Sequence, residues 1–513
     1  MATVGGASHY NWVLSIGDEL GKRGHNFTFV TCERDTKFAK PFDHVATHSV
    51  GPCTDLESLM AKGELKELMK KGSIEFLTTG MELMQTNYEQ DFLGTKQYFI
   101  DNNIDLALCD HFSDACMDAA TVLRIPFIYT GSLDLTKDSS APYINDYAIF
   151  TRGPMTTEFE SITTRFYNKF ILPMQIMKKV VPSLRRFEKR RRAVGVNVGL
   201  QDPTTRLKNT LKLIDNLHGF NAPRPSGSLV ENVGPVLPKK YTPLTRELKE
   251  FLDMHNRVAY VAFGSKATPS EKEICFILRG ILENIEHGDL DGFIWATVHA
   301  AGFFPDSITT SSNTTYFVHD MFNGYYSNIR MTKWAPQTAI LHHPSTYLFL
   351  SHGGLTSWFE SMHSGTRMIM FPFFGDQPAN AHTVEQRKLG GILKSTFTMD
   401  EAVALFKRII KDETNEITES VKRFQALAQI YTRNSITHAA DIVEEVAYTH
   451  VNGRLLHRES ADRRMSYIRA HNIDIWAMLF ALVGIALSVG VLVGYKVLAA
   501  LDKQQSATKV KTN

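Results

Sequence analysis

Apolar residues along the chain fall into two kinds of segment, short continuous runs and longer stretches with a helical period. Runs such as Phe27–Thr31 and Val258–Phe263 have the length and the Val, Phe and Tyr content of buried strands. Asn11–Arg23 has the spacing of a helix and ends at Gly24, a residue type that commonly follows helices. The other predicted strands are Leu106–Cys109, Pro126–Tyr129, Gly292–Val298 and Tyr347–Ser351. Strands that alternate with helices predict an α/β protein with parallel sheets.

A proline-rich segment divides this pattern into two regions. Five prolines fall between Ala222 and Pro243, and such clusters are typical of domain boundaries. We therefore expect two doubly wound, Rossmann-like domains that face a cleft, with ligands beyond the carboxyl ends of the strands. The predicted parts are an N-terminal domain at 1–222, a linker at 223–245, a C-terminal domain at 246–450, a connecting segment at 451–474, a membrane helix at 475–495 and a tail at 496–513.

The membrane helix is predicted from an uninterrupted apolar run near the C-terminus. Ile475–Tyr495 contains 21 residues and no charge. At about 1.5 Å per residue, a helix of this length matches a hydrocarbon core about 30 Å thick. Trp476 and Tyr495 lie at its edges, where amphipathic rings favour the membrane interface. The sequence therefore predicts a single-pass membrane protein.

The residues near the two ends of the chain bear on its topology. Four lysines follow the span and three arginines precede it closely, a small bias toward a cytosolic tail. Lys509 and Lys511 resemble the dilysine signal of endoplasmic reticulum membrane proteins. Residues 1–12 have none of the features of a signal peptide. Either the start of the sequence is missing and the large domain is lumenal, which we favour, or the span is a tail anchor and the domain is cytosolic.

Two further features of the sequence bear on the cellular compartment of the protein. The sequons at Asn26 and Asn313 are acceptors for N-glycosylation, and Asn313, in a Ser/Thr-rich loop, is the better candidate. Lys178–Arg192 contains eight basic residues and follows the apolar segment Phe170–Ile176. This segment is either a solvated helix face or a surface that lies on an anionic membrane.

Composition and missing motifs exclude several function classes. Lysine and arginine total 56 against 54 aspartates and glutamates, so we expect no nucleic-acid partner bound through bulk charge. Five cysteines form no Cys-x-x-Cys pair, which excludes a clustered-cysteine zinc site and leaves at least one thiol free. The sequence has no GxxxxGK[ST], no GxGxxG after a strand and no HExxH. We therefore expect no protein-bound metal and no cofactor.

Candidate chemistry is concentrated between Trp334 and Gly391. His352-Gly353-Gly354 ends a predicted strand and opens a helix, where backbone N–H groups and the helix dipole attract an anion. Thr356 and Ser357 add hydroxyl donors in the first turn. This combination favours a phosphate-bearing ligand.

Acidic and amide side chains follow at positions suited to hydroxyl groups. Glu360 lies two turns along the same predicted helix, where its carboxylate suits a diol such as ribose. Asp376 and Gln377 follow another predicted strand and offer hydrogen-bonding groups to a polyol.

With these residues at these spacings, the sequence resembles the UDP-glycosyltransferases, and within them the membrane-anchored, UDP-glucuronosyltransferase-like branch. The resemblance extends over nearly the whole chain and implies the GT-B fold. It is carried by Trp334-Ala335-Pro336-Gln337, His352-Gly353-Gly354, Glu360, Asp376-Gln377, the strand Val261–Ser265, the N-terminal segment Gly5–Thr31 and the terminal span.

The resemblance implies a role for each of these positions in donor binding. Trp334 would stack on uracil, Gln337 would contact the base or the ribose, and Glu360 would bind the ribose hydroxyls. The diphosphate would be held by His352 and Gly354, with Ser265 and Ser357 nearby. The sugar would be held by Asp376 and Gln377. Thr356 stands where the family has an asparagine, which bears on donor affinity or sugar preference.

The resemblance also implies a catalytic pair in the N-terminal domain. His9 stands where the family keeps its general base and Asp110 where it keeps the partner acid. A neutral histidine would take the acceptor proton, and the carboxylate would stabilise the imidazolium that forms. Without the resemblance, Asp105 and Asp114 are equal alternatives to Asp110. We expect His111 to point to the opposite face, as consecutive strand residues do.

The predicted function is an inverting, metal-independent transfer of a hexose or hexuronic acid from UDP-glucose or UDP-glucuronate to a hydroxyl of a small lipophilic acceptor. One alternative is a sterol or lipid glycosyltransferase. Another is a nucleotide-sugar-binding pseudoenzyme, because family members have a first strand before the histidine segment and only four residues precede Gly5. Arg367 and Lys266 are candidate partners of a glucuronate carboxylate by proximity in sequence. A homo-oligomer is compatible with the sequence.

Overall fold

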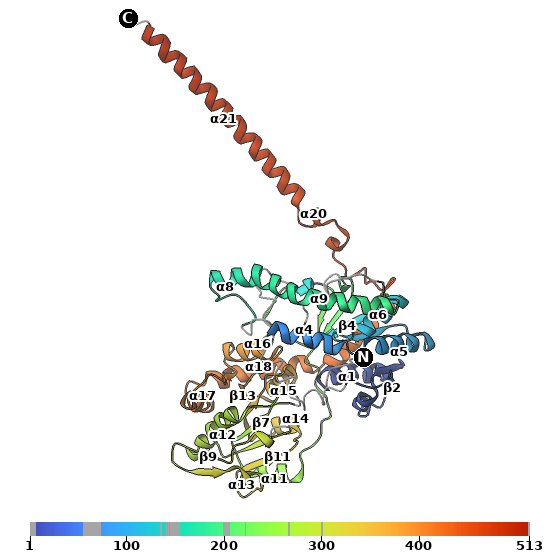
Figure 1. Ribbon diagram of the computed structural model, residues 1–513, viewed down its shortest axis with the longest axis vertical. Helices are drawn as coiled ribbons and strands as arrows, with labels where there is room; N and C mark the ends of the chain where they lie inside the picture. The colour runs from blue at the N-terminus through green and yellow to red at the C-terminus, as the bar shows by residue number, and fades with distance from the viewer. Residues whose placement is uncertain are drawn as a thin grey trace. The chain divides into compact units, whose positions relative to one another are not determined.

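The computed structural model describes residues 7–54, 73–133, 136–139, 141, 143, 154–197, 206–220, 222–264, 267–298 and 301–510 (Figure 1). The chain forms two compact units, one that ends at Leu455 and one that comprises Leu456–Asn513. The first unit contains the parallel sheets, and the second contains the long C-terminal helix.

The N-terminal half of the first unit carries its described strands in two parallel sheets. The smaller sheet pairs β1 (Phe27–Thr31) with β2 (Val45–Ser49). The larger has the order β3 (Ala107–Asp110), β4 (Phe127–Gly131), β5 (Lys212–Ile214) and β6 (Val230–Asn232). The helical elements of this half are α1 (Ala7–Lys22), η1 (Glu33–Ala39), α4 (Ser73–Met84), α5 (Tyr88–Asp101), α6 (Asp114–Leu123), η2 (Lys137–Ser139), α8 (Ile162–Phe166), η3 (Tyr167–Ile171) and α9 (Leu172–Ala193).

Helix α1 connects the two N-terminal sheets by packing against both. Its Trp12 and Ile16 share an apolar cluster with Ile128 of the larger sheet, whereas Leu14 shares one with Phe29 of the smaller sheet. The described strands of this half lie in two sheets, which are joined through this helix.

The C-terminal half is built on one six-stranded parallel sheet. Its order is β11 (Ile329–Thr332), β8 (Gly292–Ala296), β7 (Val258–Ala262), β12 (Thr346–Ser351), β13 (Arg367–Met370) and β14 (Gly390–Ile392). When only the strands of this sheet are numbered along the chain, that order is 3-2-1-4-5-6, so the winding direction reverses between β7 and β12. Ligands of doubly wound sheets bind at such a reversal, beyond the carboxyl ends of the strands.

Helices cover both faces of this sheet, as the doubly wound order requires. A small antiparallel pair, β9 (Ser307–Thr309) and β10 (Thr315–Phe317), lies outside it. The helical elements are α11 (Arg246–Met254), α12 (Glu271–Glu286), η4 (Ala301–Phe303), α13 (Val318–Phe322), α14 (Gln337–Leu341), α15 (Leu355–Ser364), α16 (Gln377–Gln386), α17 (Met399–Lys411), α18 (Glu416–Thr432) and α19 (Ser435–Thr449).

The last helix of this half returns to the N-terminal half. Val443 and Val446 of α19 belong to the same apolar cluster as Trp12 and Ile16 of α1. At the end of α1, Arg23 donates hydrogen bonds to Asp441 and Glu444, each at 2.7 Å. The two halves are therefore held together by packing as well as by the linker.

Two disulfides lie in the N-terminal half, Cys32–Cys53 and Cys109–Cys116. Among the described residues, Cys275 is the free cysteine, in agreement with the odd count. The first disulfide fixes the segment after β1 against the loop after β2, and the second joins β3 to α6.

The second unit contains η5 (Ala461–Arg464), α20 (Tyr467–Ala470) and α21 (Ile473–Val510). Over Ile473–Gln504, α21 is long and apolar enough to cross a membrane, and none of that window is buried against protein. The predicted apolar run is thus helical, and the helix extends beyond it at both ends. Length and composition alone identify it as a candidate span.

Candidate functional site

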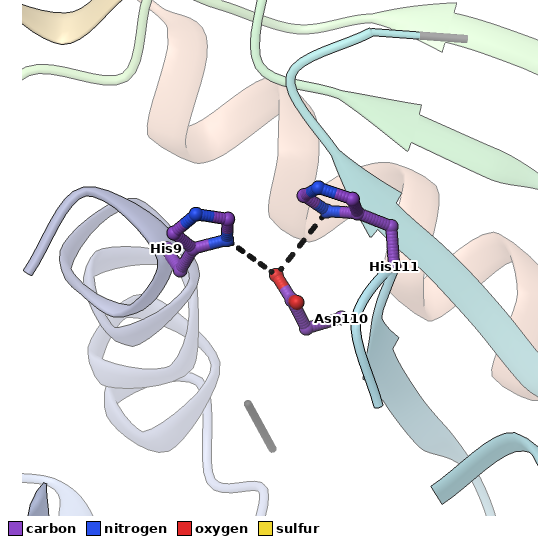
Figure 2. A group of neighbouring side chains, drawn as sticks. All are labelled: His9, Asp110 and His111. Carbon is purple, nitrogen blue, oxygen red and sulfur yellow. Dashed lines mark hydrogen bonds and ion pairs between the residues drawn. The ribbon is translucent and has the colours of Figure 1, made fainter. Parts of the chain in front are cut away.

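A histidine and an aspartate from distant parts of the N-terminal half meet at the start of α1. His9 lies in the first turn of that helix, and Asp110 is the last residue of β3. His9 Nδ1 lies 3.3 Å from Asp110 Oδ2 (Figure 2). The other carboxylate oxygen, Oδ1, accepts a hydrogen bond from the backbone N–H of Phe112 at 2.9 Å. The carboxylate is therefore fixed at both oxygens.

His111 adjoins the same carboxylate, contrary to our expectation. Its Nδ1 lies 3.5 Å from Asp110 Oδ2, and its ring stacks on that of His9 with centroids 5.1 Å apart (Figure 2). The alternation of side chains holds only within a strand. Because β3 ends at Asp110 and the chain turns there, both side chains reach the same side.

The charges of this cluster stabilise one another. Burial by itself would raise the pKa of Asp110, but the charges of the neighbouring histidines and the hydrogen bond with His9 hold it well below its usual range. Burial lowers the pKa of His111, but the charge of Asp110 raises it by more. Asp110 is therefore ionised, and an ionised carboxylate only accepts hydrogen bonds.

The tautomer of His9 follows from that ionisation. Because Asp110 can only accept, His9 Nδ1 must carry the hydrogen that points to it. In the neutral imidazole the other nitrogen, Nε2, is then without a hydrogen and can accept a proton. The pair has the arrangement of a general base with an orienting carboxylate.

In the C-terminal half, a half-buried histidine, His352, lies where the winding reverses. His352 directly follows β12, and Gly264 lies two residues beyond the end of β7. A Cβ at Gly264 would lie 3.1 Å from His352 Cε1, and one at Gly354 would lie 2.5 Å from its Nε2. Burial lowers the pKa of His352 to about 4, so the imidazole is neutral near pH 7. These glycines leave room for the ring at the start of α15.

A buried carboxylate lies farther along the same helix. Glu360 of α15 accepts hydrogen bonds from the side chains of Gln337 and Thr338, at the start of α14. Gln337 also donates to Ser357 Oγ at 3.2 Å. Burial raises the pKa of Glu360 above its ordinary value, although those hydrogen bonds oppose the rise. The residues after β11 and after β12 thus form one polar cluster.

A third group lies at the start of α16. Asp376 Oδ2 accepts a hydrogen bond from Asn380 at 2.8 Å, and the same amide donates to the Gly353 carbonyl at 2.9 Å. Gln377 Oε1 accepts hydrogen bonds from the backbone N–H groups of Phe373 and Phe374 at 2.9 and 3.1 Å. The side-chain oxygen of Gln377 therefore shapes the loop before α16, and its amide N–H groups remain available to a ligand.

The candidate groups of the two halves belong to the same compact unit. Burial raises the pKa of Asp376 above its ordinary value, although the hydrogen bond from Asn380 opposes the rise. Asp110 ends β3, and the groups of the C-terminal half follow β11, β12 and β13, so these side chains lie at the carboxyl ends of parallel strands, where ligands of such sheets bind.

Comparison with known proteins gives this arrangement a family. The family described as "UDP-glucoronosyl and UDP-glucosyl transferase" matches the chain over residues 8–493. The chain belongs to this family. It is thus a UDP-glycosyltransferase, an enzyme that takes a sugar from a UDP-sugar.

Individual relatives agree with this UDP-glycosyltransferase assignment. A UDP-glycosyltransferase of Talaromyces amestolkiae is 28% identical over 505 residues, which cover 94% of each chain. UDP-glucuronosyltransferase 3A2 of Mus musculus is 27% identical over 311 residues, 60% of this chain and 54% of that protein. The fold resembles that of Os79 from O. sativa in complex with UDP, with a TM-score of 0.59, 15% identity and coverage of 84% and 97%. The GT-B fold expected from the sequence is confirmed.

The structure places most of the predicted donor residues of this UDP-glycosyltransferase after the carboxyl ends of strands in the six-stranded sheet. Trp334 follows β11, and its indole is 60% exposed, unlike the buried Trp295 and Trp358. Thr356 is exposed in the first turn of α15. Ser357 Oγ accepts a hydrogen bond from Gln337. Ser265 lies outside the described residues, as does Lys266.

Arg367 was a wrong candidate for a partner of the sugar. It is the first residue of β13, at the amino end of that strand, whereas Asp376 follows the carboxyl end. Its guanidinium is buried, donates to the carbonyl of Ile409 at 2.8 Å and to Thr418 at 3.0 Å, and lies over the ring of Tyr347. It therefore stabilises the packing of α17 and α18.

Three residues that sequence reasoning missed complete the site. Thr338 binds Glu360, Asn380 binds Asp376, and His111 shares Asp110. Asn380 could have been predicted from the sequence as a partner of Asp376, because it lies four residues later and so on the same face of a helix. Thr338 and His111 adjoin predicted residues, but nothing in their sequence context sets them apart from ordinary polar positions.

Proposed function

We propose that this UDP-glycosyltransferase transfers a hexose or hexuronic acid to a hydroxyl of a small lipophilic acceptor, with inversion and without a metal. The observation that carries the proposal is the His9–Asp110 pair, in which His9 Nδ1 lies 3.3 Å from Asp110 Oδ2. An oriented imidazole on one side and groups for a UDP-sugar on the other are what a direct displacement needs. The same pair argues against a pseudoenzyme.

The reaction follows from these positions. His9 Nε2 takes the acceptor hydroxyl proton while the oxygen attacks the anomeric carbon and the bond to UDP breaks. Asp110 stabilises the imidazolium by its charge. The UDP leaving group carries away the bonding electrons, and the N-terminus of α15 and His352 lie where they can stabilise its charge. Attack from the face opposite UDP inverts the anomeric centre.

Release of UDP from UDP-glucose or UDP-glucuronate, measured with a panel of phenols, sterols and lipids, tests the proposal. We expect Glu360→Gln to raise the donor KM by about 10- to 100-fold, because loss of hydrogen bonds to a charged group costs about 1.5–3 kcal/mol. Glu286→Gln is the control, since Glu286 is a carboxylate that binds Thr310 at 2.8 Å, outside the site. Binding of UDP without release of UDP for any acceptor would contradict the transferase proposal.

Binding of UDP is expected to draw a proton onto His352. The imidazole has a pKa of about 4 in the free enzyme, and the negative diphosphate favours its protonated form. Affinity should therefore rise as the pH falls from 7 toward 5. Titration calorimetry in buffers of different ionisation enthalpy measures the uptake, which His352→Asn should abolish. If the His352→Asn variant takes up as many protons on binding UDP as the unmodified enzyme does, the proton is bound by UDP itself.

Metal independence has a specific test in this structure. His9, Asp110 and His111 offer ligand atoms that all lie within 4.8 Å of one another, a geometry that a zinc ion could occupy. A metal there would block the proposed base. Turnover that is unchanged by EDTA and inhibited by added Zn²⁺ supports metal-independent general-base catalysis, and loss of activity on chelation contradicts it.

We further propose that α21 anchors the enzyme in the endoplasmic reticulum membrane with the catalytic unit in the lumen. The apolar window of α21 supports the anchor. The disulfides Cys32–Cys53 and Cys109–Cys116 support the orientation, because disulfides persist in oxidising compartments such as this lumen and are rare in the cytosol.

Glycosylation at Asn313 is the expected consequence of that orientation. Asn313 is exposed in the turn between β9 and β10, and the glycosylation machinery acts only in the lumen. The protein expressed in microsomes should shift on a gel after glycosidase treatment, and Asn313→Gln should abolish the shift. Asn26, which is exposed just before β1, provides the comparison through Asn26→Gln. An unmodified protein with a protease-accessible domain would place the catalytic unit in the cytosol.

A further inference from the structure

A line of apolar side chains is exposed along the helical run of α8, η3 and α9. Successive members are three or four residues apart, the spacing of one helix face. They are Phe159, just before α8, and Ile162, Phe166, Phe170, Met174 and Met177. Each is more than half exposed, with values from 53% to 82%. We call these residues the outer stripe.

The opposite face of α9 accounts for the packing of this run. Leu172, Ile176 and Val180 are buried and form a cluster with Ile74 of α4. Figure 1 shows α8 and α9 along the outside of the first unit, with α4 next to α9. Since the inner face already provides the contact with the protein, the outer stripe has no structural role in the described part of the fold.

The outer stripe continues into exposed positive charge. Within the basic segment, Lys179 pairs with Glu75 at 2.8 Å, and Arg190 and Arg191 pair with Glu89 and Asp118. The cations on the outward face differ from these in having no acidic partner among the described residues. Lys178, Arg185 and Lys189 are exposed, and no described residue forms an ion pair with any of them. Large apolar side chains next to unpaired cations are typical of helices that lie in the interface of an anionic membrane.

We propose that the outer stripe is an in-plane membrane helix, with its apolar residues among the acyl chains and Lys178, Arg185 and Lys189 against anionic headgroups. This inference rests on the membrane anchor proposed for α21. Residues 456–472 connect that helix to the first unit and span at most about 60 Å when extended. The tether keeps the catalytic unit next to a bilayer, so weak interfacial contacts suffice for stable docking.

Lipid-depth quenching on the full-length protein tests this docking. Cys275→Ser removes the free thiol, and a fluorophore is then attached through Met174→Cys in the outer stripe or through Met254→Cys at the end of α11. Both methionines are exposed to a similar extent, 61% and 67%, which makes the second a matched control. The protein is reconstituted into phosphatidylcholine vesicles, with or without phosphatidylserine, that contain spin-labelled lipid.

The proposal expects severalfold stronger quenching at position 174 than at 254, and stronger quenching with phosphatidylserine. Lys178→Glu, Arg185→Glu and Lys189→Glu, introduced together, should reduce quenching at 174 to its level without phosphatidylserine. Equal quenching at the two positions, or no effect of the charge reversals, overturns the in-plane helix. Flotation of the vesicles separates the two proposals, because a protein that fails to float with them contradicts the anchor itself.

Discussion

Replacement of His9 by alanine is expected to lower kcat by about 10²–10⁴-fold, the usual contribution of a general base, while UDP binds as it does to the unmodified enzyme. The loss falls on kcat because the imidazole takes the proton only as the acceptor oxygen attacks. UDP binding is unaffected because the donor groups lie on the other half of the unit, after β11, β12 and β13. Initial rates of UDP release and calorimetric UDP affinity measure the two quantities.

His25→Ala provides a matched control for that variant. His25 lies just beyond the same helix, and its Nε2 is 2.8 Å from a carboxylate oxygen of Glu444, so it resembles His9 in residue type and in partner. Its contact joins α1 to α19, outside the site. We expect its loss to change stability by about 1 kcal/mol and to leave kcat unchanged. A His9→Ala enzyme that keeps the wild-type kcat would remove the general base from the proposed mechanism.

The elements that position the site were predictable where the chain buries continuous apolar runs. β1, β7 and β12 lie within about one residue of their predicted bounds. The strands that sequence reasoning missed are short or lack an apolar run. β14 consists of Gly390, Gly391 and Ile392, and its glycines resemble a turn. A Cβ at Gly390 would lie 1.7 Å from the carbonyl oxygen of Met368, its partner on the neighbouring strand β13. The requirement for glycine at this position therefore comes from strand pairing in the folded protein.

The donor side of the site was predictable because its residues cluster within one stretch of sequence at the ends of consecutive strands. The proposed catalytic pair is different, because His9 and Asp110 are far apart in sequence and only the family resemblance associated them. The contact of His111 with Asp110 could not be predicted from the sequence, for a reason that lies in the local backbone. The alternation rule applies to strands, and whether β3 continues past Asp110 depends on the turn that Phe112 and Ser113 make before α6.

Asp110→Asn should lower kcat by about 10²-fold or more, although asparagine has nearly the same size. The ionised carboxylate requires His9 Nδ1 to donate, which leaves Nε2 free to accept the proton. An amide can instead donate to Nδ1, and the hydrogen of the neutral imidazole then lies on Nε2, where it blocks the base. The asparagine also lacks the charge that stabilises the imidazolium.

Comparison with Asp110→Ala separates this electronic role from a space-filling one. If Asp110 acts through its charge, both variants should have similarly low kcat and nearly normal UDP affinity. Glu444→Gln is the control, because it makes the same change of carboxylate to amide at the partner of His25. If Asp110→Asn keeps kcat within a few-fold of the unmodified enzyme while Asp110→Ala loses it, Asp110 serves to fill space beside His9. The orientation of the base must then come from the stacked ring of His111.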